Sequence, residues 1–116
     1  MDIDKAFEAE VAAFKEKNTP SKLIKLESKF GGADIYRPNV LSTYRADGAM
    51  KSVKEGGLKH HIDLMIHVAR TVEGKPMFKE GHRDTLMKQV DYLVLRDIAA
   101  ELLDSIISSR ISDPNE

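Results

Sequence analysis

The segment from residue 84 to residue 109 has the most regular helical pattern of apolar positions in the chain. With about 100° of rotation per residue, Leu86 and Val90 fall on one side of a helix, whereas the apolar residues from Leu95 onward fall on nearly the opposite side. A surface helix that packs on a single core keeps one apolar arc. The pattern therefore predicts one helix that either kinks near Arg96 or presents two faces to two different bodies.

The second of these faces predicts a binding surface. We interpret the first half of the helix as closing the protein's own core and the second half as facing a second copy or another protein. The predicted partner-binding residues are Leu95, Ile98, Leu102 and Ile106. In the alternative explanation both faces are internal, because different helices can cover different parts of one long helix.

Shorter patterns predict the elements at the start of the chain. Residues 1–18 predict an N-terminal helix capped by Asp4. Its apolar side consists of Ile3, Phe7, Val11 and Phe14. We expect this side to dock on the body of the protein, and a detachable terminal helix is the alternative. Two apolar runs around Gly31-Gly32 then predict a β-hairpin over residues 22–37, which ends before Pro38 because proline has no N–H for a ladder.

Two further helices are predicted between the hairpin and the last segment. The first begins at Asn39 or Ser42, runs to about Glu55, and is weakened by Gly48, which costs about 1 kcal/mol relative to alanine. The second covers residues 58–71. Its predicted apolar face consists of Leu58, Ile62, Met65, Ala69 and Val72, with Ile66 and Val68 on its flanks.

Together these patterns predict an α+β fold that is mainly α, with an N-terminal helix, a short β-hairpin and three helices packed as a small helical domain. The 116 residues suit one domain. Within it, we expect the helical core at residues 39–109 and a flexible tail at residues 110–116.

Composition narrows the class of protein. The chain is 41% hydrophobic and 32% charged, which is typical of a folded soluble protein, and it has no cysteine for a disulfide or a thiolate site. The first residues are acidic and no apolar run is long enough for a membrane span, so we expect a cytoplasmic protein without a membrane partner. The mildly basic middle of the chain is weak evidence for nucleic acid at a net charge of −1.

Candidate chemistry is sparse. His60, Asp63 and His67 are spaced for one helix face, as metal ligands can be, but the amphipathic pattern places that face in water, so we expect no metal. Asp63 lies one turn from His67, which favours a protonated imidazole. Asp97 and Glu101 lie on a charged face and are predicted to be solvated. No frame surrounds a nucleophile, so we expect no catalytic residue, no cofactor and no enzyme.

One stretch resembles a known family. The loop Val72-Glu73-Gly74-Lys75-Pro76-Met77-Phe78, followed by the helix led by Asp84, is similar to the tail assembly chaperones of long-tailed bacteriophages. The order of helix, hairpin ending in Arg37-Pro38, and further helix also resembles that family. The family-like loop positions are Val72, Gly74, Pro76 and Phe78.

The resemblance implies a non-enzymatic protein of phage or prophage origin, made in the host cytoplasm and absent from the mature virion. Such proteins bind the tape-measure protein and help recruit tail-tube subunits during tail morphogenesis, and a homo-oligomer is possible. The alternative is a small helical DNA-binding or regulatory module, suggested by the basic middle and by the Gly56-Gly57 break between two helices. Leu58-Lys59-His60-His61 offers little for reading bases, however, so nucleic acid is not the expected partner.

Overall fold

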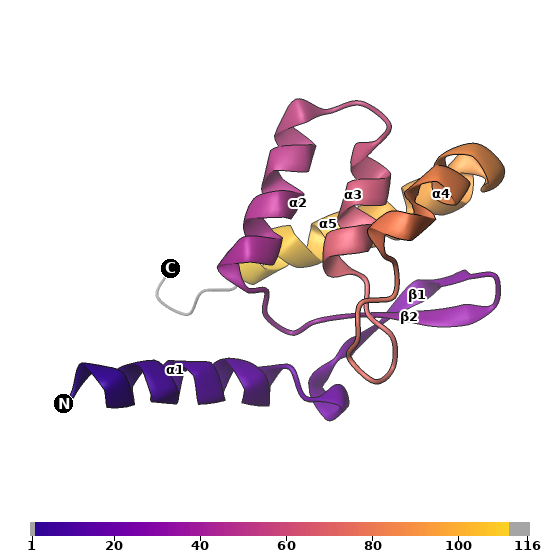
Figure 1. Ribbon diagram of the computed structural model, residues 1–116. Helices are drawn as coiled ribbons and strands as arrows, with labels where there is room; N and C mark the ends of the chain where they lie inside the picture. Colours follow the sequence, from indigo (N-terminus) through magenta and orange to yellow (C-terminus); the bar gives the residue numbers. More distant parts are fainter. Residues whose placement is uncertain (1, 112–116) are drawn as a thin grey trace.

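The computed structural model describes residues 2–111, with side chains as far as residue 104. The fold is mainly α with a small β part, as the sequence predicts (Figure 1). Its helices and strands are α1 (Ile3–Lys17), β1 (Ile24–Phe30), β2 (Ala33–Arg37), α2 (Thr43–Glu55), α3 (His60–Val68), α4 (Arg83–Gln89) and α5 (Tyr92–Ile111). Single 3-10 turns at Pro20–Lys22 and Glu80–His82 precede β1 and α4.

Helix α3 lies at the centre of the helical body, between α2, α4 and α5 (Figure 1). Six of its nine residues are buried. They are His61, Ile62, Leu64, Met65, Ile66 and Val68. A helix that is apolar on nearly all sides needs neighbours on all sides. The predicted face and its flanks omit the buried His61 and Leu64, and the two end residues of the face, Leu58 and Val72, are exposed outside the helix.

The last helical segment is divided, which corrects the prediction of one helix over residues 84–109. Helix α4 ends at Gln89, and α5 begins after Asp91, whose carboxylate accepts a hydrogen bond from the Leu93 N–H at 2.9 Å. The break therefore consists of Val90 and Asp91, and the chain is not kinked at Arg96 as predicted. Four helices follow the hairpin in the described chain, and the change of apolar side marks the junction between two of them.

The apolar side of α5 belongs to the core, so the prediction of an exposed partner surface there is wrong. Leu95 is 5% exposed, and Ile98 and Leu102 are 0% exposed. The physical reason is that α5 packs against α3, whose apolar residues need a cover on that side. Ile106 lies beyond the side chains that the structure describes, so the prediction for it stays a prediction.

Helix α5 also holds the hairpin. Strands β1 and β2 are antiparallel, with an irregular register between Lys25 and Lys29. At that irregularity the Glu101 carboxylate accepts hydrogen bonds from the backbone N–H groups of Glu27 at 2.8 Å and Ser28 at 2.9 Å. Glu101 therefore joins α5 to strand β1, and we refer to this contact as the clasp. It corrects the prediction that Glu101 is solvated.

The family-like loop continues the hairpin. Arg70 exchanges two backbone hydrogen bonds with Tyr36, at 2.9 and 2.7 Å, and bridges to Pro76 on its other side. Gly74 turns the loop with a φ of 87°, a value that favours glycine. Phe78 is buried and meets Phe30 of β1 edge-to-face at 5.0 Å between ring centroids. The loop thus packs the hairpin against the helices.

Candidate functional site: the projecting helix α1

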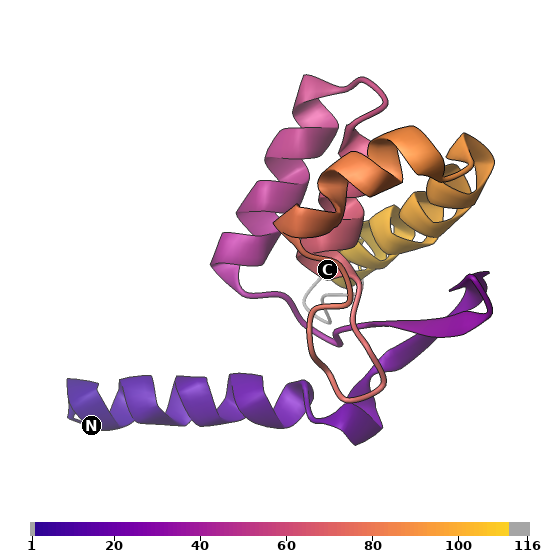
Figure 2. The ribbon, with the colours of Figure 1, turned by 45° about the vertical axis from the view of Figure 1, so that its right-hand side comes forward.

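Helix α1 extends away from the rest of the protein (Figures 1 and 2). It has no buried residue, and the molecule measures 53 × 29 × 28 Å. The radius of gyration is 15.2 Å, compared with about 13.4 Å for a compact chain of this length. The expectation that α1 docks on the body is therefore wrong. The helix is also capped two residues earlier than predicted, because the Asp2 carboxylate accepts a hydrogen bond from the Asp4 N–H at 3.1 Å.

The apolar side of α1 is open to solvent along its whole length. Ile3 is 66% exposed, Phe7 67%, Val11 51% and Phe14 38%. With about 100° per residue, these four side chains lie within about 80° of one another. A contiguous apolar strip of this kind on a surface marks an interaction site more often than scattered apolar residues do. We refer to these four residues as the arm face.

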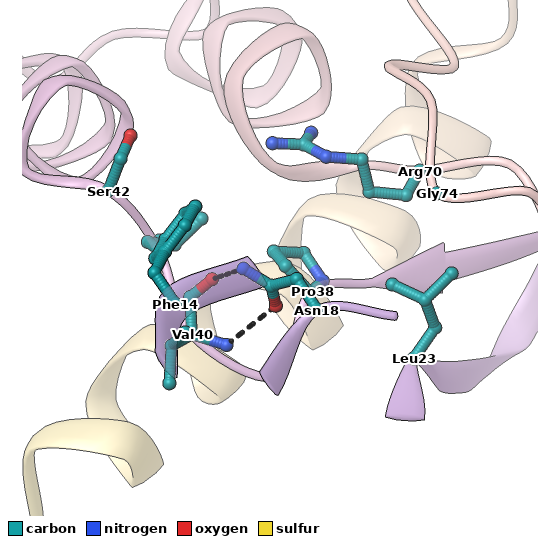
Figure 3. Close-up of a pocket in the computed structure, with 9 residues that line it drawn as sticks. Phe14, Asn18, Leu23, Pro38, Val40, Ser42, Arg70 and Gly74 are labelled. Atoms are coloured by element: carbon teal, nitrogen blue, oxygen red, sulfur yellow. Dashed lines mark hydrogen bonds between the residues drawn. The ribbon is translucent and has the colours of Figure 1, made fainter. Parts of the chain in front are cut away.

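The side chain of Asn18, at the end of α1, binds the body of the protein. The Asn18 amide donates to the Val40 carbonyl at 2.9 Å, and its oxygen accepts from the Val40 N–H at 3.2 Å (Figure 3). This two-bond pairing copies the pattern of neighbouring β-strands and satisfies both polar groups of Val40. It fixes the end of α1 beside the segment that leads into α2.

A small pocket opens beside this junction (Figure 3). Its volume is about 170 Å³. Its apolar lining comes from Phe14, Leu23, Pro38, Val40 and Leu41. Because Phe14 belongs to both, the arm face leads directly into the pocket. We refer to it as the root pocket.

Arg70 supplies positive charge at the root pocket. One guanidinium nitrogen donates to the backbone carbonyls of His67 at 3.2 Å and Ala69 at 3.1 Å, which holds the side chain in place. Burial and the nearby charge of Arg45 lower the pKa of Arg70 below its ordinary value. Within the part of the chain whose side chains are described, no carboxylate forms an ion pair with it. The pocket therefore favours an apolar group with a negative charge beside it.

The polar residues of α3 do not assemble into a site. Asp63 accepts a hydrogen bond from the Ser52 hydroxyl at 2.7 Å and pairs with Arg83 at 2.6 Å, so it links three helices. Burial would raise the pKa of Asp63, but the bonds from Ser52 and Arg83 outweigh it and the pKa is lowered. Among the residues described, no three His, Asp or Glu side chains are grouped as metal ligands are.

His67 departs from its predicted state. Its ring packs against Gly48 and lies near Tyr44. Burial first, and then the charge of Arg45, lower the pKa of His67, although Asp63 acts in the opposite direction. The neutral imidazole is therefore favoured, and the prediction of a protonated ring is wrong because the sequence showed the carboxylate but not the burial.

The apolar pattern identifies the arm face but not the root. Asn18 reads in the sequence as a helix stop, and nothing in the sequence pairs it with Val40, which lies 22 residues away. Arg70 falls on the polar face of the helix predicted over residues 58–71, where the amphipathic pattern predicts contact with water. The predicted partner-binding residues Leu95, Ile98 and Leu102 lie in the core and do not contribute to the arm face or the root pocket.

Comparisons with protein-family models, with curated proteins and with solved structures found nothing that matches this chain. In the described residues, no helix combines the length and the apolar character that a membrane crossing requires.

Proposed function

We propose that the chain is a non-enzymatic protein-binding module that acts as a phage or prophage tail assembly chaperone. It binds an apolar helical segment of the tape-measure protein and helps recruit tail-tube subunits in the host cytoplasm, without remaining in the virion. The resemblance in residues 72–84 suggests this specific partner. The exposed arm face is the observation that carries the proposal.

The shape of the arm supports a helical partner. A helix of 15 residues is about 22 Å long, and an apolar strip on it matches the spaced anchor residues of an amphipathic helix. The tape-measure protein is long and helical, and it aggregates when its apolar strips are uncovered. Binding to the arm face would cover such a strip until tail-tube subunits replace it.

The geometry gives less support to the DNA-binding alternative. A helix-turn-helix protein inserts its second helix into the major groove. The corresponding helix here is α3, which is buried on most of its surface. The exposed residues just before α3 are Leu58 and Lys59, which offer little for reading bases. Protein binding through α1 is therefore the better-supported function.

Co-expression with a tape-measure protein tests the proposal. We expect the native chain to raise the soluble fraction of the tape-measure protein several-fold and Phe7→Asp to abolish this effect. Ala9→Asp is the matched control, because Ala9 is exposed on the opposite side of the same helix. If the native chain leaves the tape-measure protein insoluble, or if both variants act alike, the proposal is wrong.

A further inference from the structure

We propose that two copies of the free chain associate through an antiparallel pair of α1 helices, with the tip of each arm seated at the root pocket of the other copy. This inference concerns the chain by itself. It holds or fails independently of the identity of any tape-measure partner.

The distribution of charge along α1 sets the direction of the pair. The outer half carries Asp2, Asp4, Glu8 and Glu10 with one lysine, whereas the inner end carries Lys15 and Lys17 with one glutamate. A parallel pair would place the two acidic halves together and align the two helix dipoles. An antiparallel pair places acidic tip against basic root at both ends.

The register of the arm face fits the same direction. Ile3 lies near the tip and Phe14 near the root, with Phe7 and Val11 between them. In an antiparallel pair, Ile3 of the second copy lies beside Phe14, and Phe7 of the second copy lies beside Val11. The same residue pairs therefore form twice, related by one two-fold axis, and both copies use the same surface, as isologous dimers require.

The root pocket supplies a seat for the tip. It begins at Phe14, which is where the register places Ile3 of the second copy. Its apolar walls suit the isoleucine side chain, and Arg70 stands beside it for the carboxylates of Asp2 and Asp4 of the second copy. The tip is acidic and apolar, and the root is basic and apolar, so each is complementary to the other.

The area involved predicts a weak pair. A strip about 22 Å long and about 10 Å wide on each arm, even with the pocket contacts added, falls near or below the roughly 1,200 Å² of total buried surface that marks the lower limit of stable interfaces. Such an association shields the arm face in the free chain and still lets a longer apolar helix displace the second copy.

Sedimentation of the full-length protein over a range of roughly 10 µM to 1 mM tests the association. We expect the apparent mass to rise from the 13.0 kDa of one chain toward twice that value. Phe7→Asp should raise the dissociation constant about tenfold or more, whereas Ala9→Asp should leave it within about twofold. Circular dichroism checks that both variants keep their helix. A monomer at every concentration, or equal effects of the two variants, overturns the proposal.

Cross-linking tests the direction, because the chain has no cysteine of its own. Asp4 and Lys15 lie on the same edge of the arm face, about 20° apart around the helix. We expect a mixture of Asp4→Cys and Lys15→Cys chains to form the mixed disulfide in preference to either symmetric one. A dominant Asp4→Cys homodimer would show a parallel pair and overturn the arrangement. Both experiments use the purified chain alone, so their failure is distinct from a failure to solubilise a tape-measure protein.

Discussion

At the scale of single residues, Gly48 shows how tertiary packing can favour glycine at a helix position where helix propensity alone favours alanine. It lies within α2 and faces the ring of His67 on α3. A β-carbon at this position would lie 2.6 Å from the ring carbon Cε1 and 2.7 Å from Nε2. The close approach of the two helices therefore depends on the missing side chain.

Gly48→Ala is expected to destabilise the protein. Helix propensity alone would favour alanine by about 1 kcal/mol, but the overlap with His67 forces the ring or the helices apart. Overpacking of this kind costs about 1–3 kcal/mol, so we expect a net loss of about 1 kcal/mol in the free energy of unfolding. Urea denaturation of the variant measures it.

The same substitution in a His67→Ala background is the control. Without the ring, the added methyl group meets no obstacle, and Gly48→Ala should then stabilise the protein by about 0.5–1 kcal/mol. A change of the same sign in both backgrounds would contradict the role given to His67.

At the scale of elements, one carboxylate joins the last helix to the hairpin. Glu101 of α5 accepts two N–H groups at the irregular part of β1, where the strand register leaves them without β2 partners. Burial would raise the pKa of Glu101, but the hydrogen bonds from Ser28 and Glu27 outweigh it, and the pKa lies below its ordinary value. The ionised form thus stabilises the fold.

Glu101→Gln is expected to lower the free energy of unfolding by about 1–2 kcal/mol at pH 7, because the amide nitrogen cannot accept the second N–H. Since the folded pKa is depressed, the contribution of Glu101 is fully present above about pH 4.3, the unfolded value, and is lost as the pH falls through the folded pKa. The difference from the native chain should therefore shrink in acid. Urea titrations at several pH values measure this.

Asp97→Asn, one helical turn earlier on the exposed side of α5, is the control. Among the described side chains it forms an exposed ion pair with Arg96 at 3.2 Å, so we expect a change within about 0.5 kcal/mol. Equal effects at positions 97 and 101 would indicate general charge repulsion and not a specific clasp.

At the scale of the whole molecule, the protein consists of a packed body and an arm that adds nothing to its core. The buried apolar residues form one cluster from the hairpin, the loop before α4 and the helices α2 to α5. Helix α1 contributes no member to that cluster. The stability of the body and the position of the arm are therefore separate properties, connected through Asn18 and Val40.

A chain that begins at Asn18 is expected to fold with nearly the same stability as the full chain. Because α1 buries no side chain, its removal should change the free energy of unfolding by less than about 1 kcal/mol. Small-angle scattering of dilute samples should show the radius of gyration falling from near 15.2 Å to about 12.6 Å.

A loss of several kcal/mol in the shortened chain would show that α1 packs against the body in solution. The full-length Phe7→Asp protein is the reference for this comparison. It removes the apolar contact of the arm face while keeping the arm's length.

Much of the fold follows from local pattern. Apolar spacing predicts α1 and α2 nearly to their ends, Ser42 is one of the two predicted starts of α2 and caps it, and Gly31-Gly32 turns the hairpin with positive φ values of 58° and 85°. These features depend on a few neighbouring residues. Local sequence therefore determines the hairpin, helices α1 and α2 and the apolar side of α1, but not the division of the last segment into α4 and α5.

Tertiary structure decides what covers each apolar side. The sequence predicts apolar sides on both α1 and α5, with α1 docked and part of α5 exposed, yet the structure shows the reverse. Contacts such as that of Glu101 with Ser28 join residues 73 positions apart, and no local signal records them. An amphipathic pattern states that a surface favours burial, but only the arrangement of the whole chain determines whether its own core or another molecule buries it.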